Sequence, residues 1–262
     1  MVTISELTIY PVKSCAGVSV DSVALDRFGP ENDRRWLVVD EAGVQITQRE
    51  LPVMALIQPS ITASGLQFKY RDQQIDVSTP HQGAPRAVQV WADRVQALDA
   101  GTVASEFFSS VLQCSARLMW MPDTTERKVD PHYAQHGETV SFADGFPLLL
   151  ISQASLDDLN TRLDQPVPMN RFRPNVVVQG CEAYAEDSWS TLISDQLEFQ
   201  IAKPCSRCVM PSINQRTSEK DSHILRALAS YRRGSDGRIY FGQNLLYQMN
   251  GQLSVGDTFA AQ

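Results

Sequence analysis

The stretch RRWLVVDEAGVQITQRE, residues 34–50, indicates which kind of fold to expect. Its run WLVV is apolar and partly β-branched, EAG supplies a short turn, and VQIT resumes a strand-like pattern. We therefore predict a strand, a turn and a second strand. Arg34 and Arg35 stand at the entrance of the first strand, where successive side chains point to opposite faces. Only one of these two arginines is thus expected to point inward.

Similar short strand patterns occur on both sides of this stretch. We expect further strands within residues 3–12, 18–26, 55–70, 87–101, 174–180, 197–204 and 251–262. Helical periodicity marks residues 102–113, 152–163 and 220–232. Thr102 and Ser152 are the candidate N-caps of the first two helices. Because many short strands favour a barrel or a sandwich, we predict a mainly β fold with flanking helices.

Composition narrows the class of protein. With 262 residues and 43% hydrophobic content, the chain can bury a substantial core, as one large domain or two packed ones. The polar segment 123–139 holds the expected boundary, which divides the chain into domains 1–122 and 123–262. A formal charge of −7 argues against a general nucleic-acid binder, although a local basic pocket remains compatible with it.

The cellular location of the protein is predicted from two kinds of segment that we do not find in the sequence, a membrane span and a signal peptide. The longest apolar run, residues 146–151, is too short to cross a bilayer, and the first residues do not have the pattern of a signal peptide. Five cysteines, an odd number that is widely spread, do not suggest a secreted disulfide framework. We therefore expect a cytoplasmic protein that acts without a membrane or a nucleic-acid polymer.

The stretch AKPCSRCVMPS, residues 202–212, carries the most distinctive chemistry, since Cys205 and Cys208 are three apart. A structural zinc site needs four ligands, and Cys181 with four scattered histidines does not complete the set. A thioredoxin-like dithiol should open a helix, and no helical period follows. The simplest interpretation of this stretch alone is one buried cysteine beside an inert surface cysteine.

Basic residues beside turns suggest an anion site. Lys13 and Ser14 follow a predicted strand in YPVKSCAG, where a lysine, a hydroxyl and turn amides could contact a phosphate. Arg171 and Arg173 are two apart in MNRFRPNVVVQG and are expected to share one face of the chain. Each group taken alone is a common surface feature, but several together suit an anionic ligand in an acidic protein.

A family resemblance rests on an ordered set of motifs rather than on any one of them. These motifs run from Tyr10 to Asp257 and are YPVKSC, DRRWLVVD, FRPNVVVQGCEAYAEDSW, PCSRC, and FGQN followed by GQLSVGD. The chain resembles MOSC-domain proteins with an N-terminal MOSC β-barrel domain, similar to the YcbX-like proteins and the mitochondrial amidoxime-reducing component. The resemblance implies two β-barrel-like domains that bind molybdenum cofactor (molybdopterin) in the cleft between them.

The resemblance also implies site residues, position by position. Cys208, the second cysteine of PCSRC, matches the thiolate that ligates molybdenum and is the expected catalytic residue; a soft anionic donor suits that metal. The expected cofactor-binding residues are Lys13, Ser14, Arg34, Asp144, Gly145, Arg173, Ser206, Arg207 and Asn244. Cys181 and Cys205 are expected to be structural, and EDSW, residues 186–189, is expected to be a turn whose tryptophan packs in the core.

The activity implied by the resemblance is reduction of small N-hydroxylated compounds. The sequence contains no plant-type CxxxxCxxC motif, so we expect no iron–sulfur cluster in this chain. Electrons are then expected from a separate ferredoxin- or flavoprotein-type donor. The alternative is a non-catalytic carrier of molybdenum cofactor, or a sulfur-transfer protein that uses Cys208 as a persulfide.

Overall fold

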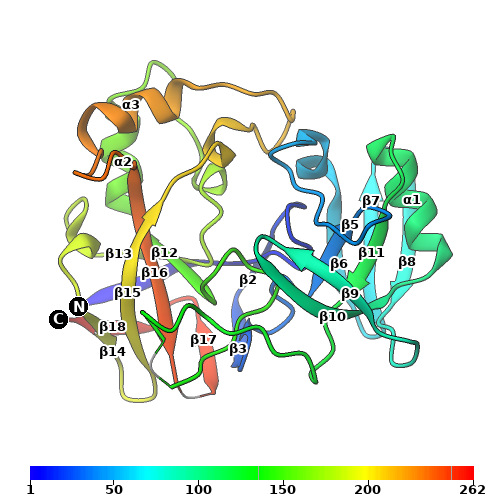
Figure 1. The fold of residues 1–262 in the computed structure, drawn as a ribbon. Helices are drawn as coiled ribbons and strands as arrows, with labels where there is room; N and C mark the ends of the chain where they lie inside the picture. The colour runs from blue at the N-terminus through cyan, green and yellow to red at the C-terminus, as the bar shows by residue number, and fades with distance from the viewer. Residues whose placement is uncertain (135, 249) are drawn as a thin grey trace.

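A computed structural model describes residues 1–134, 136–248 and 250–262, and its largest sheet closes into a barrel (Figure 1). The barrel strands are β1 (Val2–Ile9), β12 (Leu148–Ser152), β13 (Val176–Gln179), β14 (Thr191–Ile193), β15 (Glu198–Ser206), β16 (Tyr240–Tyr247) and β18 (Thr258–Ala261). Their order is β13-β12-β16-β15-β14-β18-β1, and β1 pairs again with β13 to close the barrel. Strands β12 and β13 run parallel, and the other barrel neighbours run antiparallel.

Apolar residues of the barrel strands share one core, and burial alternates most clearly along β1. Strand β1 buries Val2, Ile4, Leu7 and Ile9, with a shift of register between Ile4 and Glu6. Inward-facing residues meet in one core cluster, which includes Ile4, Leu150, Val178, Leu245 and Phe259. Strand β2 (Val18–Val20) adds to the barrel edge beside β1.

Two further sheets form what we call the second lobe. One sheet contains β5 (Trp36–Val39), β11 (Arg117–Trp120), β10 (Asp93–Asp99) and β9 (Arg86–Val90), and another contains β6 (Gln58–Thr62), β7 (Gly65–Tyr70) and β8 (Gln73–Ser78). Helix α1 (Thr102–Leu112) packs on it through Phe107 and Phe108, which stack against Phe68. This aromatic trio anchors the core of the second lobe.

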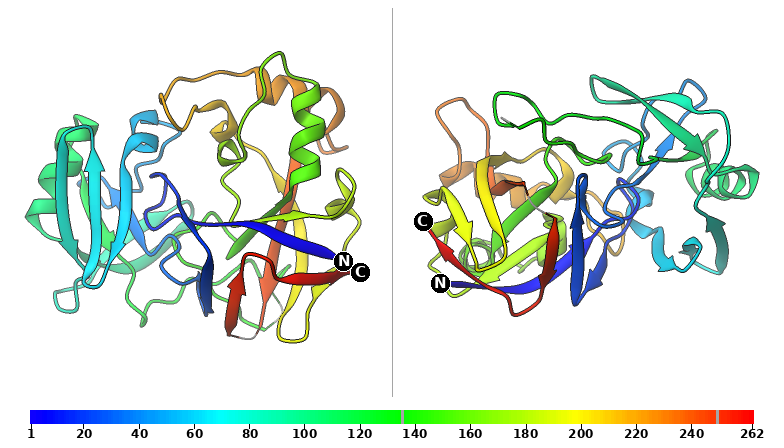
Figure 2. Two further views of the ribbon diagram at one scale, coloured as in Figure 1. Left: turned by 180° about the vertical axis from the view of Figure 1, so that it is seen from behind. Right: turned by 90° about the horizontal axis from the view of Figure 1, so that it is seen from below.

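The barrel is not built from one continuous stretch of the chain, because β1 precedes the strands of the second lobe and the other barrel strands follow them. A three-stranded sheet pairs β17 (Gly251–Ser254) with β3 (Ser22–Asp26) and β4 (Gly29–Pro30), and β1 lies in the barrel next to the C-terminal β18. Figures 1 and 2 show the two termini side by side at the barrel, with the second lobe at the far end. Strands from both sides of the expected boundary at residue 123 therefore share sheets; the boundary itself stays a prediction.

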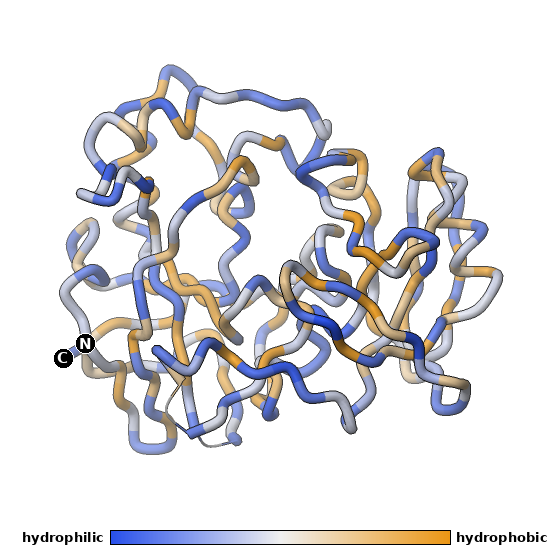
Figure 3. Tube along the Cα trace, viewed as in Figure 1, coloured by the Kyte–Doolittle hydropathy of each residue, from blue (hydrophilic) through white to orange (hydrophobic). Residues whose placement is uncertain are grey.

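The remaining elements are helices that pack against the barrel and short 3-10 turns. Helix α2 (Gln153–Thr161) and helix α3 (His223–Tyr231) lie against the barrel, and four short 3-10 turns, η1 (Pro52–Leu56), η2 (Met169–Arg171), η3 (Ala185–Asp187) and η4 (Met210–Ser212), link elements. Figure 3 shows apolar segments mainly along the strands and polar segments along the outer loops. Within the described ranges, no helix is both long and apolar enough to span a bilayer.

The predicted fold class is confirmed: the protein is mainly β with flanking helices. The three expected helices are present, and Ser152 caps α2 by accepting a hydrogen bond from the Ser155 N–H. The cap assigned to Thr102 was wrong, because α1 begins at Thr102 and its N-cap is Gly101, which has no side chain. The EDSW segment is a turn around η3, and Trp189 packs against the barrel core.

The second strand predicted within residues 34–50 does not form as a regular strand. Residues 43–46 instead divide their backbone hydrogen bonds between two neighbours. Ile46 N–H donates to Val38 O on β5, whereas Gln45 N–H donates to Gln89 O on β9. The segment therefore joins two strands of the second lobe by isolated bridges.

Gly242 offers a test of how tightly the barrel is packed. It has a φ of +82°, and an added Cβ would lie 2.6 Å from Ile151 Cγ1 and 2.7 Å from Leu150 O. We expect Gly242→Ala to destabilise the protein by about 2–4 kcal/mol, because overpacking adds to left-handed strain. The matched control is Gly237→Ala at φ +80°, where no atom lies within 4 Å, with a cost of about 1 kcal/mol. Thermal melting that shifts equally in both variants would contradict this packing.

Candidate functional site

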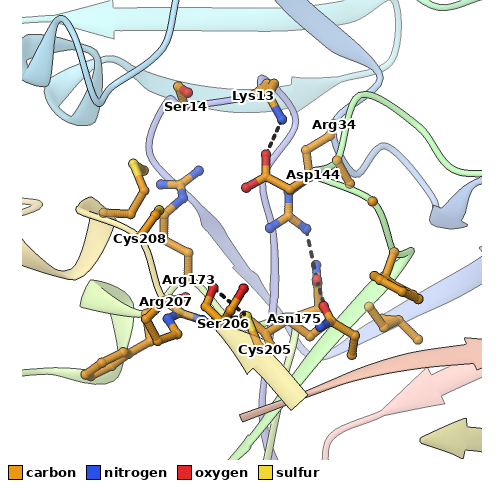
Figure 4. Close-up of a pocket in the computed structure, with 18 of the residues that line it drawn as sticks. Lys13, Ser14, Arg34, Asp144, Arg173, Asn175, Cys205, Ser206, Arg207 and Cys208 are labelled. Carbon is orange, nitrogen blue, oxygen red and sulfur yellow. Dashed lines mark hydrogen bonds and ion pairs between the residues drawn. The ribbon is translucent and has the colours of Figure 1, made fainter. Parts of the chain in front are cut away.

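A pocket between the barrel and the second lobe gathers side chains from distant segments (Figure 4). It encloses about 830 Å³, counted with the solvent at its mouth. All ten predicted site residues line it, namely Lys13, Ser14, Arg34, Asp144, Gly145, Arg173, Ser206, Arg207, Cys208 and Asn244. Further lining residues include Thr47, Arg49, Phe172, Asn175 and Cys205. The structure thus brings the predicted residues together, and what they bind stays a prediction.

Lys13 and Asp144 form an ion pair at one wall of the pocket. Lys13 is 5% exposed, and its Nζ donates to Phe142 O at 2.8 Å and to Asp144 Oδ1 at 2.5 Å. Burial lowers the pKa of Lys13 to about 8, although Asp144 acts in the opposite direction. Desolvation acts to raise the pKa of Asp144, but the charges of Lys13 and Arg49 outweigh it and hold that pKa well below its usual value. The Asp144 side chain itself is largely exposed at the pocket wall.

Two arginines lie over the ring of Tyr10. The guanidinium carbons of Arg34 and Arg173 are 4.4 Å and 4.1 Å from the ring centroid. Tyr10 is buried and its hydroxyl donates to Pro174 O at 3.0 Å, so the ring is fixed. Burial raises the pKa of Tyr10 to about 12, which keeps the ring neutral. Cation–π attraction to one ring therefore holds two like charges in the same wall.

Three pocket residues have left-handed backbone: Ser14 at φ 72°, Arg34 at φ 49° and Arg173 at φ 57°. Each such conformation costs a non-glycine residue about 1–3 kcal/mol and is retained only when the surroundings enforce it. Here the backbone Arg34 N–H donates to Tyr10 O at 2.8 Å. The unusual backbone turns these side chains into the pocket.

The left-handed turn at Arg173 also overturns one expectation. Arg171 and Arg173 do not share a face, because residues 169–171 form η2 rather than a strand. Arg171 Nε donates to Pro211 O at 2.7 Å, whereas Arg173 lines the pocket. In the other pair, Arg34 lines the pocket, whereas Arg35 is buried outside it and donates to Met121 O, so both side chains are at least partly buried.

The cysteine segment lies at the end of β15. Cys208 is exposed between β15 and η4, and its Sγ accepts from Arg49 Nε at 3.4 Å. Arg207 donates from Nη1 to Cys205 Sγ at 3.1 Å and from Nη2 to Phe172 O at 2.7 Å. Cys205 thus lines the pocket and holds the Arg207 guanidinium. Within the described residues, no group of three or more His, Cys, Asp or Glu side chains is placed to hold a metal ion.

The remaining predicted residues lie around this segment. Ser206 ends β15 and pairs with Tyr240 of β16. Asn244, also on β16, pairs with Lys203, and its Nδ2 donates to Lys203 O at 3.3 Å. At Gly145 an added Cβ would meet no atom within 4 Å, so the backbone there borders open space. Cys181 is partly buried against the barrel core, away from the pocket lining.

Sequence reasoning missed four residues that shape the pocket. Asp33 and Asn175 hold the Arg34 side chain in place. Arg34 Nη1 donates to Asp33 Oδ2 and, at 2.9 Å, to Asn175 Oδ1. Arg49 links Cys208 to Asp144 through Nε and Nη2, and Trp91 donates to Asp144 from Nε1. Asn175 lies within the recognised motif FRPNVVVQGCEAYAEDSW and could have been found. The QRE sequence around Arg49 has the pattern of a solvated surface and gave no signal.

The pocket is strongly basic in an acidic protein. Its lining contains Lys13, Arg34, Arg49, Arg173 and Arg207, and Asp144 is the acidic side chain among the lining residues. Because the local field of a cleft depends on nearby charges, the formal charge of −7 does not determine its character. The arrangement suits an anionic ligand that is also within reach of the Cys208 sulfur.

Comparisons with known proteins agree along the whole chain. A model of the MOSC N-terminal beta barrel domain matches residues 1–115, and a model of the MOSC domain matches residues 137–260. Mitochondrial amidoxime-reducing component 1 of Homo sapiens is 33% identical over 97% of this chain and 81% of its own length. Mitochondrial amidoxime reducing component 2 of Bos taurus is 34% identical over 97% of this chain and 82% of its own length.

The lowered pKa of Lys13 predicts a pH dependence of stability. Between pH 8 and its ordinary value of 10.5, the unfolded state binds more protons at Lys13 than the folded state does. The unfolding free energy of the native protein should therefore rise with pH across this window, relative to Lys13→Met. Parallel melts of both proteins from pH 7.5 to 10.5 measure the difference. Lys69→Met, at an exposed lysine, is the control; a flat difference for Lys13→Met would mean that Lys13 titrates normally.

Proposed function

The chain belongs to the MOSC family that carries the N-terminal MOSC β-barrel domain and includes the mitochondrial amidoxime-reducing components, and on that premise we propose that it is a molybdenum-cofactor-dependent reductase of small N-hydroxylated compounds. One observation carries the proposal: the exposed Cys208 thiol opens into a pocket walled by five cationic side chains from both lobes. A metal-ligating thiolate and an anion-binding wall are the two things that a phosphorylated, dithiolene-bearing pterin requires.

The residues present fit this cofactor. Among the lining residues, Arg207 has a buried Nε without a hydrogen-bond partner, and the backbone at Gly145 borders open space. Lys13, Ser14, Arg34 and Arg173 would hold the anionic portion, and Cys208 would ligate molybdenum. The proposed cofactor contacts are completed by Asp144, Gly145, Ser206, Arg207 and Asn244.

When bound, molybdenum would supply the two-electron chemistry that converts an N–OH group to N–H with uptake of two protons and release of water. The side chains of this protein would bind and orient. Asp144, held ionised by its cationic neighbours, accepts hydrogen bonds from Lys13, Arg49 and Trp91 and so fixes their positions. The Arg49 Nε–H keeps the Cys208 sulfur at the side of the pocket where both lobes meet.

Electron supply and location are further parts of the proposal. The sequence offers no cluster-binding cysteine motif, so we propose a separate ferredoxin- or flavoprotein-type electron donor. We retain a cytoplasmic location and the domain division 1–122 and 123–262 as proposals. The relatives named above are mitochondrial by name, which makes location a separate experimental question.

A second candidate function follows from the exposure of Cys208. A thiol at the mouth of a pocket is accessible to another protein. This geometry also suits a non-catalytic carrier of molybdenum cofactor, or a sulfur-transfer protein that uses Cys208 as a persulfide.

Cysteine variants test the proposed metal ligand. Cys208→Ser should lose most of its molybdenum, because a neutral hydroxyl is a poor substitute for a thiolate. Cys205→Ser should retain the metal, since that sulfur accepts a hydrogen bond from Arg207 instead. Elemental analysis of the purified proteins measures occupancy, and thermal melting checks that both variants fold. Equal loss of metal in the two variants would favour a dithiol or zinc site.

Turnover separates the enzyme from the carrier. Cofactor-loaded protein should reduce an N-hydroxylated substrate when given an artificial low-potential electron donor. NADH alone should not support turnover, because the sequence has no GxGxxG at a strand-to-helix turn. A carrier would instead turn over poorly and release cofactor readily to an apo-molybdoenzyme. Fast cofactor transfer without reduction would refute the reductase proposal.

A further inference from the structure

An exposed tryptophan, Trp91, contacts Asp144 and Arg49, two residues that line the pocket, although it is not itself among the lining residues. Trp91 lies in the tight turn between β9 and β10, and the residue is 40% exposed. Figure 1 shows this hairpin reaching from the second lobe toward the barrel. Its φ of 56° is left-handed, a conformation that hairpin turns usually give to Gly, Asn or Asp. A large apolar residue in such a position is unfavourable unless its contacts compensate.

The indole is fixed on one side by the pocket wall. Trp91 Nε1 donates to Asp144 Oδ1 at 3.3 Å, and the Arg49 guanidinium lies 4.2 Å from the ring centroid. Lys13 Nζ is 5.4 Å from the same ring. Since Arg49 Nε also donates to Cys208 Sγ, a single guanidinium bridges the indole and the proposed ligand sulfur. The ring is thus held in place close to the reaction centre.

The exposed part of the indole adds apolar surface to a polar site. Val209, directly after Cys208, is 39% exposed and is a second apolar side chain beside the proposed ligand. A tryptophan that served only packing would be buried, whereas Trp91 is oriented by polar contacts and left open to solvent. Indole faces stack on flat conjugated groups, and stacking on an aromatic side chain contributes about 1–3 kcal/mol per nucleobase.

We propose that Trp91 is a specificity-determining residue that stacks on the planar, conjugated part of the substrate at the pocket mouth, and so favours aromatic over aliphatic N-hydroxylated compounds. This inference rests on the proposed reductase function. The chemical class it selects is a flat amidoxime or an N-hydroxylated heterocyclic base, whose N–OH group can point inward while the ring contacts the indole. Arg49 and Asp144 then act as positioning residues for Trp91.

Benzamidoxime and acetamidoxime form a matched pair of probes, since they share the reacting group and differ in phenyl against methyl. Binding is measured by calorimetry to oxidised, cofactor-loaded protein without an electron donor, so that no turnover occurs. Trp91→Ala should weaken benzamidoxime binding about tenfold, which is about 1.4 kcal/mol, and change acetamidoxime binding less than twofold. Trp91→Phe should recover most of the affinity because it retains a ring. Val103→Ala, at an exposed site on α1, is the control.

Kinetics with an artificial donor provides the second readout. In Trp91→Ala the KM for benzamidoxime should rise about tenfold with kcat nearly unchanged, while both constants for acetamidoxime stay near those of the native protein. Equal losses for both substrates would show a merely structural role and overturn the inference, as would a native protein with no preference for benzamidoxime. Absence of turnover with either substrate in the native protein would instead refute the reductase proposal, and the binding comparison still decides the role of Trp91.

Discussion

A buried hydrogen-bond network around Asp33 and Asn175 links the two lobes. Asp33 Oδ1 accepts from Tyr10 N–H at 2.8 Å and from Asn175 Nδ2 at 3.1 Å, and its Oδ2 accepts from Arg34. Asn175 also donates to Thr8 O and accepts from the backbone of β12. Burial raises the pKa of Asp33, and the charge of Arg34 and the hydrogen bonds from Arg34, Tyr10 and Asn175 act in the opposite direction. Removal of one partner would leave buried polar groups unsatisfied.

This hydrogen-bond network explains how two guanidinium groups, those of Arg34 and Arg173, can lie close together in the pocket. Arg34 is neutralised by Asp33, and Tyr10, held by the same carboxylate, offers its ring to both Arg34 and Arg173. Asp144 does the same for Lys13 and Arg49. The two carboxylates therefore hold the cations of the pocket in fixed positions before any ligand arrives, which reduces the reorganisation that binding an anion requires.

The barrel topology decides which segments meet at this site. Strand β1 pairs with β13 and β18, so the turn after it carries Lys13 to the segments that contain Asp144 and Arg173. The second lobe then adds Arg49 and Trp91 from connections beside its strands, opposite Cys208 at the end of β15. The site is thus built from the junction of the lobes rather than from either lobe alone, which is why residues so far apart in sequence can act on one ligand.

The sequence alone determined the class of fold and the members of the pocket that lie in recognisable motifs. The alternating burial of β1 and the continuous apolar run of β13 are local properties, so these strands and the three helices were predictable. The gathering of Lys13, Arg173 and Cys208 was predictable through the ordered motifs. Only the tertiary structure decided that Arg49 and Trp91 belong to the site, that Arg171 turns away from it, and that residues 43–46 bridge two strands. The physical reason is that the position of a charged side chain depends on partners distant in sequence and on left-handed backbone that those partners enforce, and neither leaves a periodic pattern in the local sequence.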